Sequence, residues 1–168
     1  DFLSRLMEEE GIFYFFEHTE DGCVMHLSDD PSVHEVITGT ATIPYHPAQD
    51  GNIGGEAISS FRFGRSVRTG MVTLRDFDFK KPSLDLTLDT AADKWKELEV
   101  YDYPGAYPDS SLGKEYAKIR LEEEQVRREF GDGDGNARLM IPGFKFTLEG
   151  FKREDVNQEY VLTSVQHW

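Results

Sequence analysis

The sequence has one cysteine, few basic residues and no long apolar run, and each shortage removes a class of protein. Cys23 is the single cysteine among 168 residues, so the chain cannot form an internal disulfide. Lysine and arginine total 18 against 32 acidic residues, which gives a formal net charge of −14. Phosphate backbones and anionic membrane surfaces repel such a chain, so we expect no nucleic-acid binding. No stretch approaches the ~20 apolar residues of a membrane helix, and we expect no membrane insertion.

The N-terminus also lacks the basic segment and apolar core of a signal peptide. The sequence begins with Asp1 in place of an initiator methionine, inside an apparent helix, and it stops inside an apparent strand. We therefore interpret the chain as a fragment of a longer protein.

Metal-binding patterns are incomplete. His34-Glu35 begins like a zinc-protease motif, but the second histidine is replaced by Thr38. His26 and His34 are eight residues apart across a predicted loop, which leaves a metal site as an alternative to ordinary histidines at a turn and a strand edge. We assign no metal ligand.

The segment Asp132-Gly133-Asp134-Gly135-Asn136 opens like a calcium-binding loop. The glycine and glutamate that such a loop needs at its sixth and twelfth positions are Ala137 and Gly143 here. The segment also fails as a dinucleotide fingerprint, because the third glycine falls on Asn136 or Arg138. We predict a solvated turn after a helix, and no cofactor.

Nucleophilic and acid–base sites are equally unsupported. The sequence contains no Gly-x-Ser-x-Gly elbow, and Cys23 lies in a predicted hairpin without a helix N-terminus to lower its pKa. Nothing selects one carboxylate pair among 32 acids. An acidic hydrolase using a carboxylate pair remains an alternative; it predicts a deep pocket with two close acids of displaced pKa. We expect no catalytic residue and no enzyme activity in this chain.

The residues that are present indicate a folded, β-rich chain. Twelve phenylalanines, seven tyrosines and two tryptophans supply bulky apolar surface, mostly in short segments typical of strands. Residues 1–10 carry apolar side chains at helical spacing, and the apolar run 12–16 predicts a strand covered on both faces. Asp21-Gly22 predicts a turn into a returning strand at 23–28. Asp29-Asp30-Pro31 ends this pattern, and residues 33–55 are predicted to be mostly loop with one short strand at about 40–45.

The rest of the chain alternates predicted strands with one long helix. Leu84, Leu86 and Leu88 alternate with polar residues, as in a half-buried strand. The helix is predicted at about residues 110–130, with Ser110 or Ser111 as its N-cap. The expected apolar stripe of this helix is Leu112, Tyr116, Ile119, Val126 and Phe130. The other predicted strands are residues 57–63, 71–79, 98–103, 138–141, 145–151 and 158–168.

This order of segments predicts an α+β, β-rich fold. We expect antiparallel, barrel-like sheets with one long surface helix and a short N-terminal helix. The expected domains are residues 1–55, a helix, hairpin and loop subregion, and residues 56–168, a β-barrel-like domain. Arg62, Arg65 and Arg68 stand together in an acidic chain; they either meet an acidic patch of a partner subunit or make local salt bridges.

Several short pieces, in this order and spacing, resemble one family. They are residues 1–16, which end in Gly11-Ile12-Phe13-Tyr14-Phe15-Phe16; Asp76-Phe77-Asp78-Phe79-Lys80-Lys81-Pro82; Tyr101-Asp102-Tyr103-Pro104-Gly105; and Arg120-Leu121-Glu122-Glu123 together with Gly135-Asn136 and Pro142-Gly143-Phe144-Lys145-Phe146. Together they resemble the N-terminal, phage-baseplate-hub-like region of the valine–glycine repeat protein G (VgrG) family of bacterial type VI secretion.

The resemblance implies a structural role. Members of the family form a trimeric spike that docks on a tube of haemolysin-coregulated protein (Hcp) hexamers, with two related β-barrels in each chain. A PAAR tip protein and effectors would attach through regions absent here. The location implied is the bacterial cytoplasm before firing, followed by export through the type VI apparatus. A phage or phage-like tail baseplate hub protein is the alternative, and no catalytic residue carries over.

Overall fold

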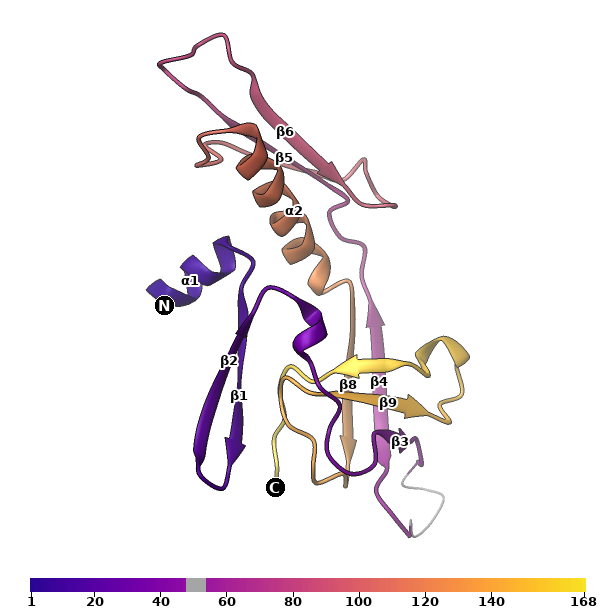
Figure 1. Ribbon diagram of the computed structural model, residues 1–168. Coiled ribbons are helices and arrows are strands. Elements are labelled where there is room, and N and C mark those ends of the chain that lie inside the picture. The colour runs from indigo at the N-terminus through magenta and orange to yellow at the C-terminus, as the bar shows by residue number, and fades with distance from the viewer. Residues whose placement is uncertain (48–53) are drawn as a thin grey trace. The chain divides into compact units, whose positions relative to one another are not determined.

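The computed structural model describes residues 1–47 and 54–168 (Figure 1). These residues form two α-helices, α1 (Phe2–Glu9) and α2 (Ser110–Val126), and short 3-10 helices at Pro31–Val33 and Glu154–Val156. The strands are β1 (Phe13–Thr19), β2 (Gly22–Ser28), β3 (Thr42–Pro44), β4 (Ile58–Arg65), β5 (Met71–Asp76), β6 (Leu86–Ala91), β7 (Glu99–Asp102), β8 (Glu129–Gly135), β9 (Lys145–Glu149) and β10 (Glu159–Val161). Neither helix is long and apolar enough to cross a lipid bilayer.

The strands form four small sheets, in the orders β1-β2, β10-β9-β3, β4-β8 and β6-β5-β7. Two pairings, β3 with β9 and β5 with β7, are parallel, so the sheets are mixed and not purely antiparallel as predicted. None of these sheets closes on itself within the described residues. The β-rich α+β class, the long helix and the short N-terminal helix are confirmed, but the barrel is not.

The chain divides into two compact units. Unit 1 consists of Asp1–Gly11 and Gly64–Phe130, and unit 2 consists of Ile12–Phe63 and Gly131–Trp168. The units are therefore interleaved along the sequence, with one boundary between α1 and β1, one inside β4 and one inside β8. The division into domains 1–55 and 56–168 stays a prediction, and each unit is described by itself below.

Unit 1 is a small sheet covered by a helix. Strand β5 lies in the middle, antiparallel to β6 and parallel to β7, and α2 packs against β5 and β6 (Figure 1). The period-two pattern predicted β6 to within two or three residues at each end. The buried hydrophobic cluster of unit 1 comes from the strands, the helix and one tyrosine: Val72, Leu74, Leu86, Tyr107, Ala117 and Leu121.

Helix α2 begins and ends differently from the prediction. Its N-cap is Asp109, whose carboxylate accepts hydrogen bonds from the backbone N–H of Ser111 and Leu112 at 2.9 and 3.1 Å. The predicted caps Ser110 and Ser111 are instead helical residues. The helix ends at Val126, because the chain enters strand β8 at Glu129.

The fully buried residues of α2 are not those of the predicted apolar stripe, although Leu112 and Tyr116 of that stripe are partly buried against the same core. Gly113, Ala117 and Leu121 are its buried residues, whereas Val126 is 71% exposed. A methyl group at position 113 would lie 2.7 Å from the Tyr107 ring. The glycine therefore lets the helix approach the sheet closely, which a search for bulky apolar residues does not detect.

Unit 2 begins with the predicted hairpin. Strands β1 and β2 pair in antiparallel register from Phe13 with Ser28 to Thr19 with Gly22. The prediction that the apolar run is covered on both faces is wrong. Only Phe15 is buried, and Tyr14 and Phe16 are exposed, because successive side chains of a strand point to opposite faces.

The core of unit 2 is assembled from strands and connecting segments. Strand β9 lies between β10 and β3, and its Phe146 and Leu148 are buried. Other core members lie outside the strands, among them Ile37 and Met140. Among the described residues, the buried members of this core cluster are Phe15, Ile37, Ile43, Ile58, Met140, Phe144, Phe146, Leu148 and Val156.

Candidate functional site

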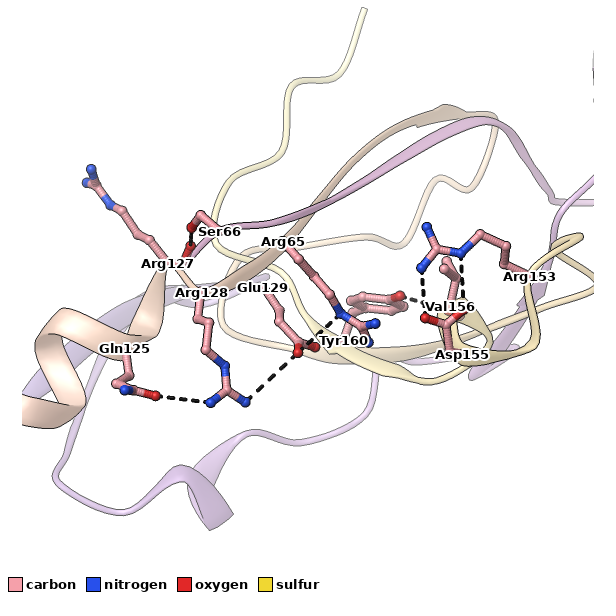
Figure 2. A network of polar contacts seen from close by, with 10 residues as sticks. All are labelled: Arg65, Ser66, Gln125, Arg127, Arg128, Glu129, Arg153, Asp155, Val156 and Tyr160. Carbon is pink, nitrogen blue, oxygen red and sulfur yellow. Dashed lines mark hydrogen bonds and ion pairs between the residues drawn. The ribbon is translucent and has the colours of Figure 1, made fainter. Parts of the chain in front are cut away.

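The arginines singled out in the sequence mostly make local contacts. Figure 2 shows Arg65, whose Nε lies 3.3 Å from Oε1 of Glu129, and Arg128, which reaches the same oxygen at 3.9 Å. The Nε of Arg68 donates to the hydroxyl of Ser66 at 3.1 Å. The prediction of a local salt bridge is therefore supported for Arg65, whereas Arg68 makes a local hydrogen bond to a serine.

The same segment ties the start of β8 to the end of β4. The Ser66 hydroxyl donates to the carbonyl of Arg127 at 3.1 Å (Figure 2). The side-chain amide of Gln125 donates to the carbonyl of Thr69 at 2.7 Å, and Arg128 donates to the Gln125 oxygen at 3.2 Å. These contacts hold the C-terminal end of α2 in place, so the residues that make them have a structural role.

The remaining residues of Figure 2 stabilise a turn in unit 2. Arg153 donates two hydrogen bonds to the carboxylate of Asp155, at 3.1 and 2.7 Å, and this carboxylate raises the pKa of the guanidinium. The Tyr160 hydroxyl donates to the carbonyl of Val156 at 2.7 Å. The Tyr160 ring also stacks on Phe146, with ring centroids 5.8 Å apart.

The acidic glycine segment is a strand and not the predicted turn. Residues 129–135 form β8, and every residue in it is exposed. A methyl group at Gly133 would lie 2.9 Å from the Phe61 ring and 3.0 Å from the carbonyl oxygen of Ser60. The glycines thus allow close approach to β4. Within residues 1–47 and 54–168, no group of three or more His, Cys, Asp or Glu residues is placed to hold a metal ion.

His26 and His34 both lie against Phe15. The His26 ring stacks on Phe15 with centroids 4.8 Å apart, and its Nε2 lies 2.9 Å from Oε2 of Glu17. The His34 ring is tilted against Phe15 at 5.5 Å, and its Nδ1 is 2.7 Å from the carbonyl oxygen of Gly143. Each ring therefore has a hydrogen-bond partner and packs as part of the core edge.

A recess of about 80 Å³ lies beside this histidine pair. Its lining is Phe15, Glu17, His26, Val33, Glu35 and Phe144. Small-molecule sites commonly measure about 300–1,000 Å³, so the recess is too small for a substrate such as a sugar. Glu17 is also engaged by His26. The carboxylate-pair hydrolase gains no support from this recess.

A wider, open groove of about 260 Å³ lies on unit 1. Arg75, Phe77, Tyr101 and Tyr103 line it. The parallel register of β5 and β7 explains why these segments meet, since Leu74 lies opposite Asp102. Sequence reasoning named both segments as family pieces but did not predict that they join in one groove. None of these four lining residues carries a carboxylate, so the part of the groove that the structure describes offers no acid–base pair.

The shifted pKa values belong to structural contacts. Burial raises the pKa of the Tyr107 hydroxyl, which donates to the carbonyl of Leu86. The Tyr116 hydroxyl donates to the Glu10 carboxylate at 3.0 Å, and this hydrogen bond raises the pKa of the Tyr116 hydroxyl. A hydrogen bond from the backbone N–H of Ser32 lowers the pKa of Asp30 at a helix start. These shifts mark caps and packing and not a reactive site.

Comparison with known proteins identifies the family of the chain. The family model described as the phage tail baseplate hub (GPD) matches residues 1–168, which is the whole chain. The chain belongs to this family. The predicted hub-like resemblance is thereby confirmed.

Curated relatives add the type VI connection. The chain is 35% identical over 174 residues to the type VI secretion system spike protein VgrG1a of Pseudomonas aeruginosa, covering 99% of this chain and 26% of that protein. It is 34% identical over 170 residues to VgrG1b of the same organism, covering 99% of this chain and 23% of that protein. The actin cross-linking toxin VgrG1 of Vibrio cholerae is 29% identical over 171 residues, or 99% of this chain and 15% of the toxin.

The coverage is asymmetric. The chain spans about a quarter of the spike proteins VgrG1a and VgrG1b. The activities of the full-length relatives, including the one named as a toxin, therefore do not transfer to these 168 residues by similarity alone.

Proposed function

We propose that the chain is the hub-like structural region of a type VI secretion spike protein. The observation that carries the proposal is the match of the baseplate hub family model over residues 1–168, together with 34–35% identity to two spike proteins across 99% of the chain. The described residues support it, because their polar contacts serve caps, turns and strand pairing.

The proposal includes the assembly implied by the resemblance. The full-length protein associates as a trimer and docks on the Hcp tube hexamer, while a PAAR tip and effectors attach through regions outside residues 1–168. The barrel-like closure and the domains 1–55 and 56–168 belong to this larger assembly. Support comes from the small open sheets, which leave strand edges for further pairing.

The proposal also covers chemistry and location. This region performs no catalysis, and the protein resides in the bacterial cytoplasm before firing and is then exported through the type VI apparatus. Membership of the family and the names of the spike relatives support this view. The open groove on unit 1 has an aromatic lining that suits contact with another protein.

A chimera tests the proposal. The aligned region of VgrG1a is replaced by residues 1–168, and release of the Hcp tube protein into the medium is measured in cells that lack the parent gene. We expect release near the parental level, with a trimer visible by native mass spectrometry. A chimera that accumulates and remains folded, yet forms no trimer and releases no tube protein, contradicts the proposal. VgrG1a lacking the aligned region is the negative control.

The phage-tail alternative rests on one observation, the description of the family itself as a phage tail baseplate hub. The sequence that follows residue 168 in the full gene separates the two functions. Valine–glycine repeats and a β-helix favour the spike, whereas a lysozyme-like insertion favours the phage hub.

A further inference from the structure

One stretch of unit 2 carries negative charge without compensation. Residues 12–61 include eight acidic residues and no lysine or arginine. Six of those acids lie in or beside the β1–β2 hairpin, at positions 17, 20, 21, 29, 30 and 35. The hairpin therefore has no lysine or arginine of its own, and among its acids Glu17 is paired with the His26 ring at 2.9 Å.

The same hairpin exposes a continuous apolar face. In the antiparallel register Tyr14 lies opposite Leu27 and Phe16 lies opposite Met25, and directly opposed residues share a face. Their exposed fractions are 41% for Tyr14, 46% for Phe16, 42% for Met25 and 55% for Leu27. Tyr14 and Phe16 also contact each other edge to face, with centroids 5.9 Å apart. We call these four side chains the outer hairpin face.

The opposite side of the hairpin is already occupied. Phe15 is buried there against Phe144, with ring centroids 6.0 Å apart, and His26 stacks on it. Position 143 is a glycine with φ of +88°, where any side chain would collide with the Phe15 ring. The hairpin is thus held by its inner side, which keeps the outer hairpin face turned away from the core of unit 2.

Charge decides which partner suits this face. A second copy would bring two uncompensated acidic hairpins together, and like charges across an interface disfavour binding. An anionic membrane would be repelled for the same reason. We propose that the outer hairpin face docks a protein segment whose apolar side chains are flanked by lysine or arginine. The inference goes beyond the proposed structural role and does not depend on it.

The test uses defined peptides as probes and the whole chain, labelled with ¹⁵N for NMR. The main probe is a blocked octapeptide that alternates lysine and valine. Two comparison peptides alternate glutamate with valine, or lysine with serine. We expect the lysine–valine peptide to shift amide signals of residues 13–28 and to bind about tenfold or more tightly than either comparison peptide.

Two variants check the location. Phe16→Ser/Leu27→Ser removes apolar surface from the outer hairpin face and should weaken binding of the lysine–valine peptide about tenfold or more. The matched control Phe79→Ser/Val126→Ser makes the same kinds of change at residues of unit 1 that are 77% and 71% exposed, and should leave binding unchanged. Glu20→Lys/Asp21→Lys should also weaken binding, whereas Glu124→Lys on α2 should not.

Three results would overturn the inference. The lysine–serine or glutamate–valine peptide binds as tightly as the lysine–valine peptide; the signal shifts map outside residues 13–28; or the Phe16→Ser/Leu27→Ser variant, folded by its NMR spectrum, binds normally. Self-association of the unmodified chain in sedimentation experiments, lost in Phe16→Ser/Leu27→Ser, would assign the face to a second copy instead. Each of these results leaves the chimera experiment unaffected.

Discussion

The two compact units hold together in different ways. In unit 1 the buried residues come mainly from β5, β6 and α2, where they recur at the period of the element that carries them. In unit 2 several buried residues lie between strands, including Ile37, Met140 and Val156. Regular elements explain most of the first core, whereas the second depends on segments that pass through irregular structure.

The aromatic residues sharpen this comparison. Unit 2 contains a connected group of rings in which Phe61, Phe146, Phe151 and Tyr160 contact one another. Unit 1 buries a single tyrosine, Tyr107. Its ring packs against α2 at Gly113, where the lack of a side chain leaves room for it. Large rings fill irregular spaces, while small residues allow a helix and a sheet to pack closely.

The largest expected effect is a cavity in unit 2. Leu148 is 0% exposed in the central strand β9, so Leu148→Ala should lower the free energy of unfolding by about 2–5 kcal/mol. Leu139→Ala, at a residue of the same unit that is 47% exposed, is the matched control. Urea unfolding followed by circular dichroism measures both variants. Equal losses would show that the unit 2 core is not centred on β9.

The second effect concerns close packing in unit 1. Alanine normally stabilises a helix by about 1 kcal/mol relative to glycine. Gly113→Ala should instead destabilise the protein by about 1–3 kcal/mol, because the added methyl group meets Leu88 and Tyr107. Gly55→Ala is the control, since nothing lies within 4 Å of a methyl group there. A stabilising Gly113→Ala would mean that α2 is not seated closely on the sheet.

A smaller effect tests how α2 begins. Asp109→Ala should cost about 1 kcal/mol, since it removes the acceptor for two helix N–H groups. Ser110→Ala should change the stability little, because Ser110 is already helical. Thermal unfolding of the two variants compares them directly. A larger loss of stability in Ser110→Ala than in Asp109→Ala would instead support the serine N-cap predicted from the sequence.

The smallest effect is a pH dependence confined to unit 1. The raised pKa values of Tyr107 and Tyr116 mean that the folded state keeps these protons longer than the unfolded chain. Their contribution is complete below the ordinary tyrosine pKa of about 10 and is lost as the pH rises through the folded-state values. The melting temperature should therefore fall above pH 10, and less steeply in Tyr107→Phe. If the melting temperature falls with pH equally steeply in both proteins, Tyr107 is not a cause of the fall.

Sequence reasoning succeeded where a pattern is local. The turn at Asp21-Gly22 predicted the β1–β2 hairpin, and the alternating leucines predicted β6, because both signals depend on neighbouring residues. The long helix and the family resemblance were also predicted correctly. Among the candidate site residues, Arg65 makes a local salt bridge, one of the two alternatives considered, and Arg68 makes a local hydrogen bond to Ser66.

One prediction made from glycine residues was wrong. Gly131, Gly133 and Gly135 were interpreted as a turn, since glycine is common in turns, but they lie in a strand that approaches β4 closely. Gly113 likewise shows its purpose only beside Leu88 and Tyr107. A missing side chain fits both a turn and a close contact, and only the neighbouring element distinguishes them.

The sequence by itself determined the β-rich class, the hairpin, the helix and the membership of the baseplate hub family, because periodicity and motif order are properties of the chain. The tertiary structure alone decided which faces are covered. Tyr14 and Phe16 are as apolar as Phe15, yet they are exposed because only the inner side of the hairpin meets the unit 2 core. Burial depends on distant partners, and the alternation of a strand does not say which of its two faces finds one.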